Sequence, residues 1–173
     1  SSSIDYRTVL VSYNNDLISK NEAIQELLSF KEVNSVHEYS ELQIPMKINN
    51  ITQKENSFYL MGSDKSPIKL STGSELIEED RTIICPQYFY PYETNNTWNY
   101  NYKNAIDLSN YLNKYISLSF LDSDETENYK LVGLYDPSIS NTYGIICYTS
   151  WENVQKLNLK YQNEFFKETT ESY

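Results

Sequence analysis

The apolar and polar positions at the start of the chain predict a strand followed by a helix. Residues 6–13 (YRTVLVSY) are rich in β-branched and apolar side chains, which favours a strand. Ser19 and Glu22 have the spacing of a capping box, in which each side chain bonds the other residue's backbone N–H. The apolar positions after this cap recur with a helical period as far as about Phe30.

The pattern then returns to β character. Residues 33–39 alternate between apolar and polar side chains, and residues 42–48 continue in the same way. A helix of about 12 residues is long enough to carry the chain back to a second, parallel strand. We therefore expect the first fifty residues to form a β-α-β unit.

The middle of the chain changes to short strand patterns separated by turns, and the end returns to a helix. Strands are expected at residues 58–61, 68–70, 82–85, 115–120, 129–135 and 144–148. Thr149 and Glu152 suggest a second capping box before the last helix. The expected fold class is α+β, with a β-α-β lobe made by residues 1–55 plus 145–173 and an inserted β-rich lobe at residues 56–144, all in a single domain.

The segment 86–102 (PQYFYPYETNNTWNYNY) has no clean period and is expected to be a long loop. Tyrosine and tryptophan dominate interface hot spots, so this loop is the predicted partner-binding site for a peptide, a glycan or a protein. The alternative is that its rings cover the β-rich lobe as an auxiliary core. Its seven aromatic residues are Tyr88, Phe89, Tyr90, Tyr92, Trp98, Tyr100 and Tyr102.

Composition and charge exclude several classes of partner. The 24 Asp and Glu residues outnumber the 14 Lys and Arg residues, and the formal net charge is −10. Because nucleic acids require a basic footprint and the chain has no basic cluster, we expect no nucleic-acid partner. No apolar run approaches the roughly 18–20 residues of a membrane-spanning helix, and the first residues lack a signal-peptide pattern.

The two cysteines end similar apolar runs, Ile83-Ile84-Cys85 and Ile145-Ile146-Cys147. One interpretation is a disulfide between two strands. The other is a pair of buried free thiols, since an unpaired cysteine behaves as a small hydrophobic residue. The sequence leaves both open, because it does not give the distance between the two Cα atoms.

Signatures of catalysis and of metal binding are absent from the sequence. There is no G-x-S-x-G turn, no phosphate-binding loop and no G-x-G-x-x-G fingerprint. His37 is the single imidazole and lies in a predicted strand, where an exposed position is the simpler interpretation. The acidic groups at residues 78–80 and 122–125 lack the spacing of a calcium loop, so solvated turns are expected. We predict no enzyme activity, no metal and no cofactor.

The order of the later motifs resembles a known family. Five pieces carry this resemblance: Gly73-Ser74-Glu75-Leu76, Arg81-Thr82-Ile83-Ile84-Cys85, Leu112-Asn113-Lys114-Tyr115-Ile116-Ser117-Leu118, Tyr129-Lys130-Leu131-Val132-Gly133-Leu134-Tyr135-Asp136 and Ile145-Ile146-Cys147-Tyr148-Thr149. Together they resemble the extracytoplasmic domain of MacB/FtsX-like ABC transporter permeases, the MacB-like periplasmic core domain. Asn113 stands where the family often has glycine, a mild change because asparagine tolerates a left-handed backbone. On this resemblance, the family's second β-α-β half is expected to be missing or truncated after Tyr161.

The resemblance implies a domain on the extracytoplasmic face of a bacterial cell membrane, with the β-α-β lobe near the membrane and the β-rich lobe farther out. Its implied partners are the transmembrane helices of the same permease, a cytoplasmic ATPase acting through them, and a peptide or protein ligand. It implies no catalytic residues. The frequent Asn, Tyr, Ile and Lys residues suggest an AT-rich genome and a Gram-positive cell surface. The alternatives are a free-standing cell-surface module that binds peptide or glycan and an enzyme whose site is unrecognised.

Overall fold

The computed structural model describes residues 9, 11–14, 16–38, 42–51, 58–78, 80–89, 105–121, 123–139 and 146–171, with side chains up to residue 161 in the last range. Two α-helices are described, α1 (Lys20–Leu28) and α2 (Trp151–Glu171). Short 3-10 helices occur at η2 (Leu108–Tyr111) and η3 (Pro137–Ile139). The strands are β1 (Ile44–Ile48), β2 (Phe58–Gly62), β3 (Leu70–Gly73), β4 (Thr82–Pro86), β5 (Tyr88–Phe89), β6 (Ile106–Asp107), β7 (Tyr115–Phe120), β8 (Glu127–Tyr135) and β9 (Ile146–Thr149).

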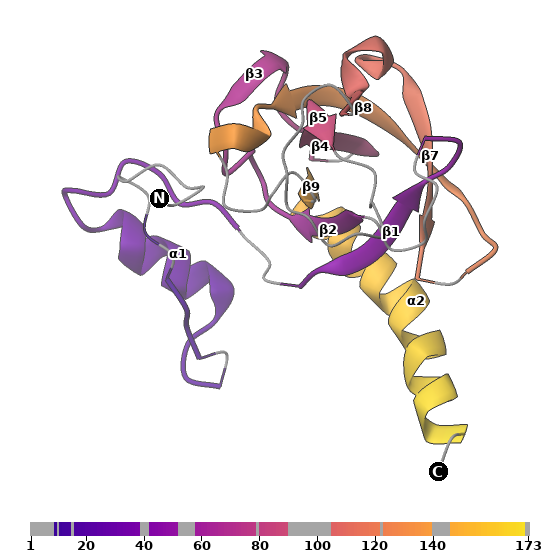
Figure 1. The fold of residues 1–173 in the computed structure, drawn as a ribbon. Helices are drawn as coiled ribbons and strands as arrows, with labels where there is room; N and C mark the ends of the chain where they lie inside the picture. Colours follow the sequence, from indigo (N-terminus) through magenta and orange to yellow (C-terminus); the bar gives the residue numbers. More distant parts are fainter. Residues whose placement is uncertain are drawn as a thin grey trace.

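Within these ranges, six strands close into a mixed β-barrel in the order β8-β4-β9-β2-β1-β7 (Figure 1). The pairs β2–β9 and β4–β8 are parallel, whereas the other four neighbouring pairs are antiparallel. The long strand β8 closes the barrel by pairing with β7 along its first residues and with β4 along the rest of its length. Its last residues also pair with the additional strand β3. Closure therefore uses the edges of all six strands.

Two apolar clusters follow from the alternation of side chains along these strands. One contains residues of every barrel strand, such as Met46, Leu60 and Leu118, and therefore fills the interior. The other includes Ile84 and Tyr148 and covers the outer face of β2, β4, β8 and β9 under the segment between β2 and β4. Strands β4 and β9 are thus buried on both faces, which explains their continuous apolar sequences.

Helix α2 packs against β2 and then projects away from the barrel toward the C-terminus (Figure 1). Its buried side chains Val154, Leu157 and Tyr161 belong to the interior cluster. A Cβ atom on Gly62 of β2 would lie 3.1 Å from the Cα of Trp151, so the close approach of helix and strand depends on this glycine. The first turns of α2 therefore contribute side chains to the barrel core.

The β-α-β lobe expected from the sequence is wrong, and the fold is β-rich rather than α+β. Residues 9 and 11–14 form no strand, and Val9 and Val11 are 78% and 56% exposed. Residues 33–38 are irregular, and β1, assigned to the same lobe, pairs with β2 and β7 in the barrel. Strand propensity depends on packing against a neighbouring strand, and these described residues pair with none.

The capping boxes predicted before the two α-helices differ in how far the structure confirms them. The Ser19 cap before α1 is confirmed, because the Ser19 hydroxyl accepts from the Glu22 N–H at 3.2 Å. The other half of the capping box is not formed, since the Glu22 carboxylate accepts from the Ser19 hydroxyl at 3.0 Å rather than from the Ser19 backbone N–H. The second box is wrong by one residue. Ser150, rather than Thr149, accepts from the backbone N–H three residues later, at 3.1 Å. The Thr149 hydroxyl instead donates to the carbonyl of Thr82.

Candidate functional site

The aromatic segment begins on two short strands that hold its first residues against the barrel. Tyr88 and Phe89 form β5, which pairs with β6. Phe89 is only 4% exposed and packs edge-on against Phe58, with 4.9 Å between ring centroids. Tyr88 is half-buried, and its hydroxyl accepts from the Gln87 side chain. Phe89 therefore serves the core, while the predicted site residues Tyr90, Tyr92, Trp98, Tyr100 and Tyr102 lie outside the described residues.

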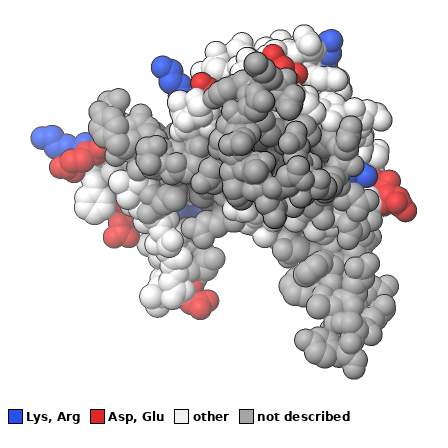
Figure 2. All heavy atoms as spheres, in the orientation of Figure 1, with Lys and Arg blue, Asp and Glu red and all other residues white. Residues whose placement is uncertain are grey.

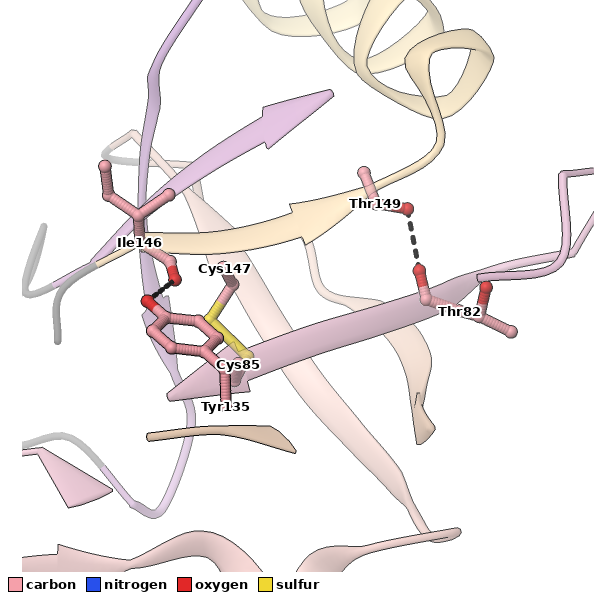
Figure 3. The surroundings of a disulfide bond; sticks show 6 residues. All are labelled: Thr82, Cys85, Tyr135, Ile146, Cys147 and Thr149. Carbon is pink, nitrogen blue, oxygen red and sulfur yellow. Dashed lines mark hydrogen bonds between the residues drawn. A yellow bond between two sulfur atoms is a disulfide. The ribbon is translucent and has the colours of Figure 1, made fainter. Parts of the chain in front are cut away.

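The two cysteines form a disulfide between neighbouring strands in the core (Figure 3). Antiparallel pairing of Ile84 with Tyr148 places Cys85 opposite Cys147, with 4.3 Å between their Cα atoms. That distance is close to the ~4.5 Å of a non-hydrogen-bonded antiparallel pair. Of the two interpretations of the sequence, the structure therefore supports the disulfide.

The disulfide lies in the seam between β4 and β9, where the described ladder has one backbone pair. Side chains reinforce this seam on both sides of the disulfide (Figure 3). Tyr135 of β8 donates to the Ile146 carbonyl at 2.5 Å, and Thr149 donates to the Thr82 carbonyl at 2.7 Å. The barrel thus closes here through a covalent bond and side-chain hydrogen bonds in place of a long ladder.

The residues considered for catalysis or calcium binding are dispersed. His37 is exposed in an irregular segment rather than in a strand. Glu78, Asp80, Asp124 and Glu125 are exposed, and the remaining residues of the two acidic groups lie outside the described ranges. Among the residues that the structure describes, no three His, Cys, Asp or Glu side chains converge as metal ligands.

A buried carboxylate connects α2 to the barrel. Glu127 of β8, 7% exposed, accepts from Arg81 and Lys160 at 2.8 Å and from the Tyr161 hydroxyl at 3.1 Å. Burial alone would raise its pKa, but the bonds from Lys160 and Tyr161 and the nearby cations outweigh burial and hold the pKa below its usual value. Lys160 also pairs with Glu125, and hydrogen bonds to the two carboxylates raise its own pKa. These four residues, called here the Glu127 cluster (Glu127, Arg81, Lys160 and Tyr161), therefore attach the middle of α2 to the barrel.

A cavity of about 340 Å³ opens between α1, the residues that follow it and the start of α2. Ile24 and Val36 are the aliphatic members of its lining, and the indole of Trp151 is the aromatic one. Its charged lining residues are Lys20, Glu38, Asp64, Glu78 and Glu152. Residues from five separate stretches of the chain therefore meet at this one cavity.

One of the lining residues, Lys20, has its ammonium group beside a carboxylate and an aromatic ring. The Nζ atom of Lys20 is 2.6 Å from Glu38 Oε1 and 5.0 Å from the centroid of the Trp151 ring. The hydrogen bond to Glu38, followed by that residue's charge, raises the pKa of Lys20. The backbones of Glu38 and Asp64 are joined by a 3.1 Å bond, and the Glu38 N–H also donates to the Asp64 carboxylate at 2.8 Å. Two carboxylates are thus held in fixed positions beside one aromatic ring.

Sequence reasoning missed this cavity because its residues are far apart in the chain. The separation between Lys20 and Trp151 carries no periodic signal, and each residue is unremarkable in its local context. Among the candidate site residues that the structure describes, only Glu78, from the acidic group at residues 78–80, contributes to the lining, and the pattern of that group predicts a solvated turn. Tertiary contact alone brings the tryptophan, the lysine and the carboxylates together.

On the face drawn in Figure 2, the acidic and basic side chains of the described residues are scattered, with no broad patch of Lys and Arg. No helix among the described residues is both long and apolar enough to span a membrane. Comparison with protein-family models, with curated proteins and with solved structures finds no match to this chain.

Proposed function

We propose that this chain is a non-catalytic extracytoplasmic domain of an ABC transporter permease, and that it engages a substrate or a partner protein outside the membrane. The observation that carries the proposal is the buried Cys85–Cys147 disulfide. Disulfides form and persist in oxidising compartments and are rare in the cytosol. A disulfide in the seam of the barrel favours a protein that folds on the extracytoplasmic side.

Helix α2 offers a route by which movement in a membrane could reach the barrel. It follows β9 after a single residue, Ser150, and β9 is joined to β4 by the disulfide. The hydrogen bonds from Lys160 and Tyr161 to Glu127 attach the same helix to β8, the strand next to β4 in the barrel. Because these connections are short, a displacement of α2 would move the barrel as one body. This supports a domain that transmits motion rather than one that catalyses a reaction.

The motif resemblance to MacB/FtsX-like permeases gives this proposal its partners. They are the transmembrane helices of the same permease, a cytoplasmic ATPase and a peptide or protein ligand, on a Gram-positive cell surface. Two of the resembling motifs meet in the structure, since Gly73 of β3 lies opposite Gly133 of β8. The proposal rests on these motifs and the disulfide, without the β-α-β lobe that the resemblance implied.

The redox state of the two cysteines in the source cells tests the location. Cells are lysed into an alkylating reagent, and the intact parent protein is analysed by mass spectrometry with and without later reduction. We expect Cys85 and Cys147 to resist alkylation until reduction, while the cysteines of a cytosolic protein in the same lysate react at once. Complete alkylation before reduction would overturn the extracytoplasmic location.

The open reading frame of the parent protein tests the attachment. We expect one transmembrane helix shortly before Ser1 and three more well after Tyr173. A signal peptide or lipid-attachment motif with no such helices would overturn the permease assignment and would favour a free-standing binding module.

A further inference from the structure

The cavity beside α1 has the chemistry of a site for an organic cation. At neutral pH its lining carries four carboxylates and one ammonium, so the net charge facing the cavity is negative. Glu38 is paired with Lys20, and Glu152 with Lys156 at 3.0 Å. Among the residues described, Asp64 and Glu78 line the cavity without a salt bridge to any cation. An added positive charge would therefore be attracted rather than repelled.

The position of Lys20 shows which kind of cation fits. Its ammonium lies over the face of Trp151 and against the Glu38 carboxylate, an arrangement that combines cation–π attraction with an ion pair. The Lys20 side chain is 42% exposed, so its pairing is weak and exchangeable. The cavity thus contains an amine-binding arrangement that the chain's own lysine occupies.

Other ligand classes fit less well. An anion would face the four carboxylates, and a neutral apolar ligand would desolvate them without compensation. The volume of about 340 Å³ is near the lower end of the roughly 300–1,000 Å³ typical of ligand sites. This size suits one side chain with its adjoining backbone better than a large molecule.

We propose that this cavity binds a lysine side chain of a peptide or protein partner, and that Lys20 is an internal occupant which the partner's lysine displaces. The inference names the ligand chemistry of the binding role proposed above and rests on that role. It predicts that removal of the Lys20 ammonium strengthens binding, because the competing occupant is lost and the cavity becomes more negative.

The test follows the indole N–H signal of Trp151 by NMR during titration with the peptide acetyl-Gly-Lys-Gly-amide. A Trp98→Phe variant assigns the signal of the other tryptophan. We expect a saturable shift of the Trp151 signal, and no shift with the same peptide acetylated on the lysine Nε atom. Absence of a saturable shift in both the wild type and Lys20→Met would overturn the proposal.

Matched variants separate the contribution of the cavity to lysine binding from that of the overall negative charge of the protein. Lys20→Met is expected to tighten binding about 2- to 10-fold, the range expected when weak ion-pair and cation–π contacts no longer compete. Lys114→Met makes the same change in net charge at an exposed residue that does not line the cavity, and should leave affinity unchanged. Equal effects of the two variants would show long-range attraction only and would overturn the proposal.

Two further variants change lining residues of the cavity. Trp151→Leu should reduce affinity at least 5-fold, measured by the shift of backbone signals near Glu38. Because Trp151 also contacts the barrel, Glu78→Gln provides a milder change at an exposed residue and should weaken binding about 2- to 5-fold. Unchanged affinity in Glu78→Gln together with Trp151→Leu would count against the site. If the disulfide is oxidised in cells but the lysine peptide does not bind, only this inference is refuted. If the peptide binds but the cysteines are reduced in cells, only the extracytoplasmic location is refuted.

Discussion

At the residue scale, the backbone of β3 depends on glycine. Gly73 has a φ of +90°, a conformation that L side chains rarely adopt. A Cβ atom on this residue would lie 2.2 Å from the Val132 carbonyl oxygen and 2.7 Å from the Cα of Gly133. The Val132-Gly133 motif noted in the sequence therefore has a packing role, since it lets β3 and β8 approach closely. Asn113 likewise has a left-handed φ of 65°.

Gly73→Ala is expected to destabilise the protein by about 2 kcal/mol or more, because it adds both backbone strain and a steric clash. Urea unfolding under non-reducing conditions, followed by circular dichroism, measures this change. Ser74→Ala, at the exposed neighbouring residue, is the control and should change stability by less than about 0.5 kcal/mol. Equal stabilities of the two variants would contradict the argument from close approach.

At the scale of elements, the fold depends on how α2 is attached. The helix is amphipathic, and its apolar side chains Val154, Leu157 and Tyr161 enter the barrel core. Its polar side also has a specific partner, because Lys160 and the Tyr161 hydroxyl reach the buried Glu127 carboxylate of β8. The attachment is therefore both apolar and ionic.

Glu127→Gln should lower the free energy of unfolding by about 1–3 kcal/mol at pH 7, the range for a hydrogen bond to a charged group. The folded pKa of Glu127 is below its unfolded value, so the ionised carboxylate contributes its full stabilisation above the ordinary glutamate pKa of 4.5. This contribution is lost as pH falls through the folded pKa. The difference between wild type and variant should therefore shrink when unfolding is measured below pH 4.5.

Glu125→Gln is the matched control for this experiment. Glu125 pairs with the same lysine but is 61% exposed, so the loss should stay below about 0.5 kcal/mol. A Glu127→Gln variant whose deficit is the same at pH 7 and at low pH would refute the electrostatic role of Glu127.

At the scale of the whole molecule, closure of the barrel depends on the seam between β4 and β9. Among the described residues, the other neighbouring strand pairs of the barrel have at least three paired residues, whereas this seam has one. The disulfide therefore joins the barrel where the described ladder is shortest. It spans 62 residues of sequence and links strands formed at distant points in the chain.

Replacing both cysteines, Cys85→Ala with Cys147→Ala, is expected to lower the free energy of unfolding by about 4 kcal/mol, the chain-entropy value for a loop of this length. Denaturant unfolding of the oxidised wild type, the reduced wild type and the double variant measures the loss. The reductant should destabilise the wild type and leave the variant unchanged. A reduced wild type as stable as the oxidised one would contradict this role for the disulfide.

The sequence by itself determined the local features of this protein. The start of α1 and the extended character of the apolar strands follow from neighbouring residues. Each depends on interactions within a few residues, such as the two hydrogen bonds between Ser19 and Glu22. The aromatic segment was also evident from sequence, although only Tyr88 and Phe89 of its seven aromatic residues lie in the described part.

The tertiary structure alone decided which strands are neighbours. Periodicity shows that a segment is extended but not which edge it joins, so β1 and β9 could be assigned to one lobe although they belong to the closed barrel. The same reason applies to the disulfide and to the cavity. Cys85 meets Cys147, and Lys20 meets Trp151, only because distant segments pack together.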